Sequence, residues 1–248
     1  MSALTTLRRA FYNAGGPWYR NRLFERLGSE RYAQPALHGM DARLDELLGR
    51  TGGVFFEAGA HDGFTQSNTY FLERHRGWSG VLVEAIPELH RKAVRRRPRS
   101  KVFHAALVAP EDAGSTVTLQ FGDLQSGSSA EHAVGGLLNA GRAAYSVDVP
   151  ARTISDVLDE ANVARLDLLV LDIEGAELAA LRGLDRARHE VEVLVIEMLD
   201  MPSQREAFDA FLADTHEPAG TLSPDDAVYR IRADAAGGAA TAASAAPG

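Results

Sequence analysis

The stretch from Val54 to Gly63, which reads VFFEAGAHDG, constrains the fold more than any other part of this chain. A short apolar run ends in Glu57 and then breaks into a turn that contains two glycines and an aspartate, just before a segment compatible with a helix. This order is typical of a parallel strand that presents a ligand at its carboxyl end. Gly59 and Gly63 allow the close backbone approach and positive φ that such a turn uses.

Three later apolar runs end in the same way. They are Gly80–Ala85, with Glu84 near its end, Leu166–Ile173, with Asp172 near its end, and Val191–Glu197. A helix is expected over 68–76, between the first two runs. Because the carboxyl ends of parallel strands meet at one edge of a sheet, the four acids are expected to face one crevice. The pattern predicts an α/β fold with a doubly wound, mostly parallel sheet and helices on both faces.

The spacing of the first turn bears on the kind of ligand. It is Glu-x-Gly-x-x-x-Gly rather than Gly-x-Gly-x-x-Gly, so an adenosine-bearing cation fits better than a dinucleotide pyrophosphate held on backbone amides. A carboxylate at the end of the second strand, here Glu84, can accept both hydroxyls of a ribose. An acid at this position also suits NAD, so an NAD-dependent oxidoreductase stays an alternative, as does a non-catalytic nucleotide-binding module.

The middle of the chain is less regular. A third strand is expected over 102–108, and alternation over 116–121 favours an extra strand. The residues 109–145 as a whole form a long connection, which we interpret as an acceptor-side loop. A helix then opens near Thr153 or Ser155, either of which suits an N-cap.

Four motifs together resemble a known family, the FkbM family of S-adenosylmethionine-dependent methyltransferases. They read FEAGAHDG (56–63), QSNTYFLE (66–73), WSGVLVEA (78–85) and LDIEGAE (171–177), and the resemblance covers roughly residues 50 to 200. The family's usual Asn in the first motif is His61 here, so a role that needs an amide is not carried over. The resemblance implies a class I methyltransferase (Rossmann-like) fold, bound S-adenosylmethionine and an oxygen nucleophile on a sugar or natural-product acceptor.

The resemblance to this family implies a role for each of these strand ends. We expect the aminoacyl part of the cofactor to be held by Glu57 and by the loop that contains Gly59, Ala60, Asp62 and Gly63, and its ribose to be held by Glu84. Ser67 and Ala85, from the second and third motifs, complete the predicted cofactor-binding set.

Asp172 is our first candidate for orienting or deprotonating the acceptor, because it lies where the transferred methyl is expected; its other interpretation is a helix N-cap. His61 is the second catalytic candidate, and His104 is the other histidine near a strand end. As an alternative, Asp172, Glu174 and Glu197 gather Mg²⁺, which prefers carboxylate oxygens. Glu177 is interpreted as a solvated acid of the first helical turn.

We divide the chain into a helical N-terminal extension (1–50), a methyltransferase domain (51–233) and a disordered Ala/Gly-rich tail (234–248). The extension is interrupted at Gly15-Gly16-Pro17, and an apolar face that includes Tyr19 and Leu23 is expected to pack on the domain or to cap the acceptor pocket. The basic run Arg91–Arg99 is interpreted as a solvated helix rather than an anion or membrane patch.

Composition excludes several classes of function. The formal net charge of -8 argues against a nucleic-acid partner, and the absence of cysteine rules out disulfides and a thiol nucleophile. No run is apolar for long enough to cross a membrane, and the N-terminus does not read as a signal peptide. We therefore expect a cytoplasmic enzyme with a small-molecule acceptor and no membrane partner, and the sequence leaves a homo-oligomer open.

Overall fold

The computed structural model describes residues 15–121, 145–198 and 201–235. Most of the expected acceptor-side loop (109–145) therefore lies outside the described residues, as does almost all of the predicted tail.

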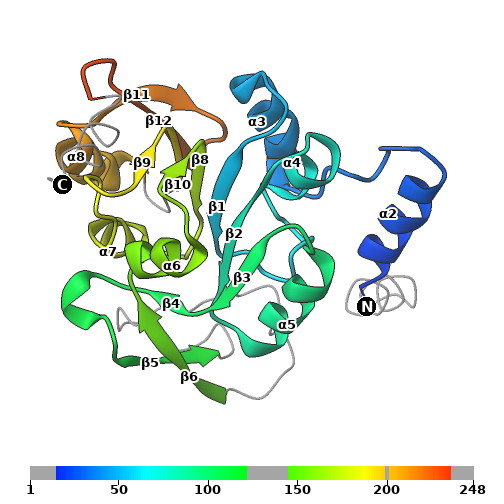
Figure 1. Cartoon of the computed structure of the whole chain (residues 1–248), viewed down its shortest axis with the longest axis horizontal. Coiled ribbons are helices and arrows are strands. Elements are labelled where there is room, and N and C mark those ends of the chain that lie inside the picture. Colours follow the sequence, from blue (N-terminus) through cyan, green and yellow to red (C-terminus); the bar gives the residue numbers. More distant parts are fainter. Residues whose placement is uncertain (1–14, 122–144, 199–200, 236–248) are drawn as a thin grey trace, which may run out of the picture.

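A single large sheet organises the fold (Figure 1). It has seven strands in the order β11-β12-β10-β8-β1-β2-β3. Their bounds are β1 (Val54–Ala58), β2 (Ser79–Glu84), β3 (Lys101–His104), β8 (Leu168–Leu171), β10 (Val193–Glu197), β11 (His216–Thr221) and β12 (Asp226–Ile231). Pairs among β3, β2, β1, β8 and β10 are parallel, whereas β12 runs antiparallel to both β10 and β11. Strand order reverses between β1 and β8, which is where ligands bind in open α/β sheets.

Apolar side chains alternate between the two faces of this sheet, as the period of two requires. Phe55, Leu82 and Val170 belong to one core cluster, which also contains residues of α3 (Met40–Leu48) and α4 (Tyr70–His75). Phe56 and Leu171 belong to a second cluster on the other face. The helices of that second cluster are α6 (Ile154–Ala161), α7 (Glu177–Arg182) and α8 (Met201–Leu212). Helices on both faces confirm the predicted doubly wound, mostly parallel architecture.

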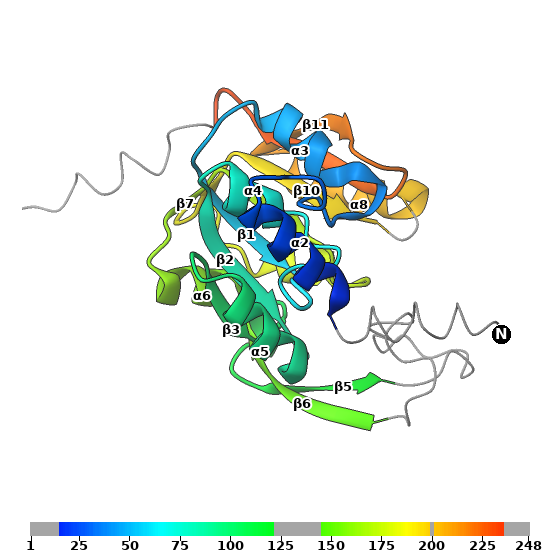
Figure 2. The ribbon, with the colours of Figure 1, turned by 90° about the vertical axis from the view of Figure 1, so that its right-hand side faces the viewer.

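The expected third strand over 102–108 is divided in two. β3 continues the main sheet, while β4 (Ala106–Leu107) pairs instead with β6 (Tyr145–Arg152). β6 also pairs with β5 (Thr116–Phe121), the predicted extra strand, so β4, β6 and β5 form a small sheet of their own. β6 itself was not predicted. In Figures 1 and 2 this small sheet extends beyond the main one. Two short strands, β7 (Arg165–Leu166) and β9 (Glu190–Val191), pair in parallel ahead of β8 and β10.

The start of α6 confirms the predicted N-cap at Thr153. Its side chain accepts the N–H of Asp156, and the Asp156 carboxylate accepts the N–H of Thr153, which completes a capping box. The short 3₁₀ segments η1 (Leu37–Gly39) and η2 (Pro110–Asp112) lie in connections.

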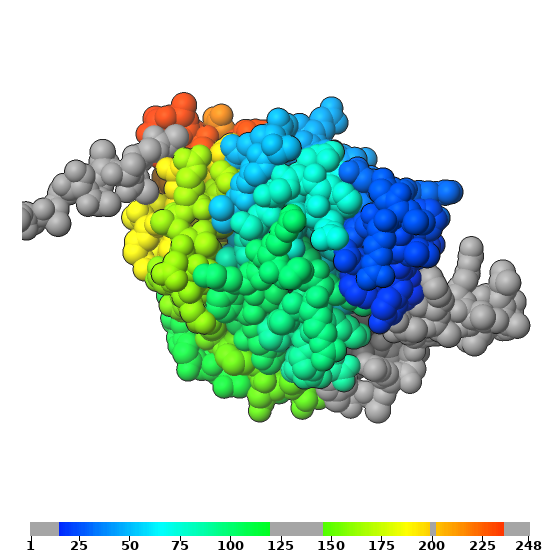
Figure 3. Space-filling model, turned by 45° about the vertical axis from the view of Figure 1, so that its right-hand side comes forward, coloured from blue at the N-terminus to red at the C-terminus, as the bar shows by residue number. Residues whose placement is uncertain are grey.

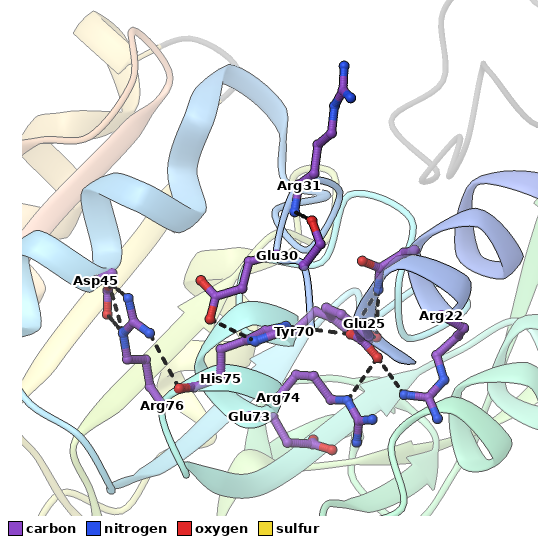
Figure 4. A network of polar contacts seen from close by, with 12 residues as sticks. Arg22, Glu25, Glu30, Arg31, Asp45, Tyr70, Glu73, Arg74, His75 and Arg76 are labelled. Atoms are coloured by element: carbon purple, nitrogen blue, oxygen red, sulfur yellow. Dashed lines mark hydrogen bonds and ion pairs between the residues drawn. The ribbon is translucent and has the colours of Figure 1, made fainter. Parts of the chain in front are cut away.

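The helix α2 (Gly16–Arg26) packs differently from the prediction. Tyr19, Leu23 and Leu27 of the expected apolar face are 63%, 57% and 72% exposed, whereas Trp18 and Phe24 are half-buried and Trp18 lies against the guanidinium of Arg96. The expected face therefore packs on the described part of the domain only in part. α2 instead meets α4 through polar contacts (Figure 4): Glu25 accepts the hydroxyl of Tyr70 at 2.9 Å and faces the guanidinium of Arg74 at 3.0 Å. This polar contact between α2 and α4 leaves Tyr19, Leu23 and Leu27 at the surface.

None of the helices in the described ranges combines the length and the apolar character that crossing a bilayer requires.

Candidate active site

Glu84 is the last residue of β2, and its carboxylate bonds both to the loop after β1 and to the residues after β2, at the edge of the sheet where ligands bind. One carboxylate oxygen accepts the N–H of His61 at 2.7 Å, and the other accepts the N–H of Ile86 at 2.7 Å. Each oxygen keeps a second lone pair for a ligand hydroxyl. Burial raises the pKa of Glu84 to about 7, against the lowering effect of these two N–H donors.

The loop after β1 directs its backbone donors at the protein itself. The N–H groups of Gly59 and Ala60 both donate to the carbonyl of Val83 at 3.1 Å, and that of Gly63 donates to the carbonyl of Ala60 at 2.9 Å. The N–H of His61 is held by Glu84. Few backbone donors of this loop therefore remain for an anionic ligand group.

Gly59 also lets the loop pass the end of β8. Its φ is +78°, and a Cβ placed on it would lie 1.9 Å from the carbonyl oxygen of Asp172. A glycine is therefore required here by both conformation and space. This contact brings the turn after β1 against the turn that follows β8.

Asp62 organises the loop from inside. Its Oδ1 accepts the N–H of Phe64 at 3.1 Å and of Thr65 at 2.8 Å, and its Oδ2 forms an ion pair with Arg96. Burial favours a raised pKa for Asp62, but the hydrogen bond and charge of His61 and the charge of Arg96 outweigh it and hold that pKa well below its usual range. The Asp62 carboxylate is thus fully engaged within the protein.

His61 takes a left-handed backbone conformation with φ of 50°. Its side chain is 18% exposed, and Nδ1 lies 3.6 Å from Oδ1 of Asp62. These contacts place His61 beside the residues of the predicted cofactor site, and its role as a base stays a prediction. His104 lies elsewhere, where its Nε2 donates to the carbonyl of Ala85 at 2.9 Å.

Glu57 faces the interior of the domain. β1 continues past it to Ala58, and its side chain lies on the face that α4 covers. Its carboxylate accepts the N–H of Asn68 at 2.7 Å and the hydroxyls of Ser67 at 3.0 Å and Thr69 at 2.5 Å. The buried guanidinium of Arg97 lies 3.5 Å away. These contacts favour a structural role for Glu57, and its predicted contact with a cofactor stays a prediction.

Arg97 connects this buried network to α4 and was not foreseen as a core residue. It lies in the basic run that we interpreted as a solvated helix, of which α5 (Pro87–Arg96) forms the larger part. Arg97 itself is 1% exposed and donates to Glu73 at 2.7 Å, to Ser67 at 2.9 Å and to Thr69 at 2.8 Å. Ser67 is therefore engaged on all sides, between Glu57 and Arg97.

Asp172 and Glu197 form a carboxyl pair at the ends of β8 and β10. The two side chains are in hydrogen-bonding contact, yet the buried Oε2 of Glu197 has no N–H or O–H donor among the described residues. Two carboxyl groups form a hydrogen bond of this kind when they share one proton. Burial and the charge of Asp172 raise the pKa of Glu197, and burial with the neighbouring acids Glu174 and Asp226 raises that of Asp172.

Asp226 joins this edge from the antiparallel strand β12, where it pairs in register with Glu197. Sequence reasoning missed it, because an acid that begins an antiparallel strand carries no motif of its own. Glu174 is exposed, and it does not complete a metal cluster: the described residues contain no group of three or more Asp, Glu or His side chains arranged to hold a metal ion. The Mg²⁺ site at Asp172, Glu174 and Glu197 therefore stays a prediction.

The prediction for Glu177 was wrong. Instead of a solvated acid, it is 3% exposed, and its Oε1 accepts the N–H groups of Ile173 and Gly175, each at 3.0 Å. These bonds fix the turn that follows β8, so Glu177 holds the backbone beside Asp172 in place.

Comparison with known proteins agrees with this geometry. Residues 57–222, more than half of the 248 residues, match the methyltransferase FkbM domain. The chain is also similar to the methyltransferase sdnD of Sordaria araneosa, at 38% identity over 80 residues. That match covers 29% of this chain and 31% of the relative, so the chain spans about a third of the length of the curated relative it matches.

Solved structures show weaker similarity. A TehB-like S-adenosylmethionine-dependent methyltransferase from Corynebacterium glutamicum matches 87% of this chain and 100% of its own, with 14% identity and a TM-score of 0.43. Precorrin-6y C5,15-methyltransferase from Geobacter metallireducens matches 79% of this chain and 88% of its own, with 12% identity and a TM-score of 0.44. On the evidence of the domain match, the chain belongs to the FkbM methyltransferase family.

Proposed function

We propose that the protein transfers a methyl group from S-adenosylmethionine to a hydroxyl oxygen of a small-molecule acceptor, such as a sugar or another natural product. Membership of the family supports methyl transfer. When bound, the cofactor supplies a methyl group carried on a positively charged sulfur. The choice of an oxygen acceptor rests on the carboxyl pair described below.

The backbone of the loop after β1 is the observation that carries the choice of cofactor. A dinucleotide pyrophosphate needs free N–H donors at this position. Here those of Gly59, Ala60, His61 and Gly63 all donate to protein acceptors. The surrounding strand ends carry acids instead, so the site suits a cation-bearing nucleoside better than NAD.

Glu84 is the residue that fits the ribose. Its carboxylate is 6% exposed and is held rigidly by two backbone donors, which leaves one lone pair on each oxygen for the ribose hydroxyls. Each bond of a hydroxyl to a charged acceptor is worth about 1.5–3 kcal/mol.

Asp172 and Glu197 fit the task of moving the acceptor proton. A pair that shares one proton keeps one carboxylate free to accept a second proton, and its raised pKa brings that basicity closer to neutral pH. The carboxylate of Asp172 would take the proton of the acceptor hydroxyl, while the bound cofactor would supply the methyl group to the acceptor oxygen and leave without it. Glu197 stabilises the protonated form by retaining the hydrogen bond.

Asp172→Asn tests this assignment. The amide keeps the size of the side chain but is not a base, so we expect turnover to fall by about 10²-fold or more while cofactor affinity stays within a few-fold. The assay follows a labelled methyl group from S-adenosylmethionine into products formed with extracts of the source organism. Transfer by the variant at the wild-type rate would remove Asp172 from the chemistry.

Glu174→Gln distinguishes proton transfer from metal catalysis. If Asp172, Glu174 and Glu197 gather Mg²⁺, this variant and a chelator should both reduce turnover, and Mg²⁺ should restore the chelated wild type. If the carboxyl pair acts alone, the chelator has no effect and Glu174→Gln stays near the wild-type rate. Binding of S-adenosylmethionine without transfer to any acceptor would favour a non-catalytic module.

A further inference from the structure

Arginines from three helices surround a hollow on the outer side of α4. Figure 3 shows α2 lying against the surface formed by α4 and α5. The hollow has a volume of about 80 Å³, and its lining includes Arg22 from α2, Arg74 from α4, and Arg95, Arg96 and Arg99 from the end of α5 and the residues after it. These are residues from separate parts of the sequence that the fold brings together.

Two of these arginines lack a carboxylate partner among the described residues, although the carboxylate of Glu73, which is held by Arg97, also lines the hollow. Glu25 faces both Arg22 and Arg74, and Asp62 faces Arg96. Arg95 and Arg99 have no carboxylate partner in the part of the chain that the structure describes; Arg99 donates only to the carbonyl of Glu73, at 3.2 Å. In a chain with a net charge of -8, the hollow is therefore a local concentration of positive charge that would attract an anion.

Trp18 forms a further wall of the hollow. The guanidinium of Arg96 stacks on its ring at 4.9 Å, and its buried indole Nε1 has no acceptor among the described residues. A groove of about 410 Å³, lined by Trp18, Arg22 and Arg95 together with Tyr19, Leu23 and Arg26, continues from the same residues. The hollow thus offers several charge-assisted donors, and an amphipathic groove adjoins it.

We propose that this hollow binds a phosphate- or pyrophosphate-type oxyanion, with Arg22, Arg74, Arg95 and Arg99 as its donors. Planar guanidinium groups match the oxygens of a phosphate in pairs, which distinguishes this cluster from a general basic surface. The groove then accommodates the remainder of the phosphorylated molecule. The lining of this hollow contains neither the carboxyl pair nor Glu84, so the site is distinct from the proposed site of methyl transfer.

The test compares two double variants of α5 and its end. Arg95→Gln/Arg99→Gln removes two arginines from the lining, whereas Arg91→Gln/Lys92→Gln removes the same charge from exposed positions one turn earlier on α5 that do not line the hollow. Calorimetric titration of the full chain with inorganic pyrophosphate at low salt gives the dissociation constants. Loss of two charge-assisted bonds should weaken binding by about tenfold or more in the first variant, with at most a twofold change in the second.

Trp18 provides a local readout. Trp78 is fully buried, so a change in tryptophan emission with pyrophosphate should disappear in Trp18→Phe. Equal weakening in both double variants, or no binding by the wild type, would overturn the proposal.

A second arm identifies the source of the phosphate. Binding to phosphatidylglycerol vesicles but not to phosphatidylcholine vesicles, lost in Arg95→Gln/Arg99→Gln, would assign the site to a lipid headgroup. Pyrophosphate binding without vesicle binding would assign it to a soluble phosphate ester. Vesicle binding that both double variants retain would count against the hollow as the site.

Discussion

Replacement of Glu57 by Gln separates a structural role from a role in binding the cofactor. In the wild type, Oε2 of Glu57 accepts the hydroxyls of Ser67 and Thr69, while the same two hydroxyl oxygens accept N–H groups of Arg97. The new amide would place an NH₂ group either at the position of Oε2, 3.5 Å from the guanidinium of Arg97, or at the position of Oε1, opposite the N–H of Asn68. Donor would then face donor inside the core.

The size of the effect follows from the burial of Arg97. Breaking a buried ion pair from one side costs about 3–5 kcal/mol, and the low end applies because Arg97 keeps its contact with Glu73 at 2.7 Å. For a protein of this size, about 3 kcal/mol lowers Tm by roughly 6–12 °C. Calorimetric melting of Glu57→Gln without ligand measures it, with the exposed Glu111→Gln as the control expected to melt like the wild type.

The opposite result would refute this reasoning. If Glu57 holds the cofactor instead, the variant should melt within about 2 °C of the wild type, a change of less than about 1 kcal/mol. Its dissociation constant for S-adenosylmethionine should then rise about tenfold, the equivalent of one lost hydrogen bond.

Further predictions concern the two strand ends that meet at the switch point. Ribose hydroxyls donate to the charged form of Glu84, whose pKa is about 7, so affinity for S-adenosylmethionine should rise as pH increases through about 7 and then level off. Titrations over about 1.5 pH units on either side of this pKa should show the rise, and Glu84→Gln should remove it. Without ligand, the raised pKa of Glu84 should make the fold lose stability as pH rises from its unfolded value of about 4.5 to about 7; increasing stability over this interval in wild type relative to Glu84→Gln would contradict the assignment. Gly59→Ala should destabilise the fold by several kcal/mol more than Gly114→Ala, since both have similar positive φ but only the first meets a backbone oxygen, at 1.9 Å. Equal losses of unfolding free energy in the two variants, measured by urea denaturation, would show that the turn after β1 adjusts to the added methyl group.

The parallel centre of the main sheet could be predicted from the sequence because β1, β2, β8 and β10 are largely apolar on both faces and each has an acid at or next to its end. Glu84 and Asp172 lie where that pattern placed them, at the ends of β2 and β8. The hairpin of β11 and β12 was not predicted: β11 is largely exposed and reads HEPAGT, which lacks the apolar alternation of a half-buried strand. Asp226 was missed with it.

Other differences arise from tertiary contacts that a linear pattern does not contain. Glu57 and Glu84 look alike in sequence, yet one is followed by a further strand residue and lies under α4, while the other ends its strand. Arg97 and Glu177 look like solvated charges in the sequence, yet both are buried. Arg97 donates to Glu73 of α4, and Glu177 accepts the N–H of Ile173 in the turn just before its own helix. For Tyr19, Leu23 and Leu27 of α2 the difference is the opposite, because they were expected to pack and are exposed. The contact of Glu25 with Tyr70 fixes the orientation of that helix.

Calorimetric titration of the full chain with S-adenosylmethionine and, separately, with NAD⁺ distinguishes the two cofactors. The loop after β1 has its N–H groups occupied, and Glu84 is positioned for a ribose between acidic strand ends. The account predicts one-to-one binding of S-adenosylmethionine, weakened by about tenfold or more in Glu84→Gln, and no measurable heat with NAD⁺. Binding of NAD⁺ with no binding of S-adenosylmethionine would contradict it.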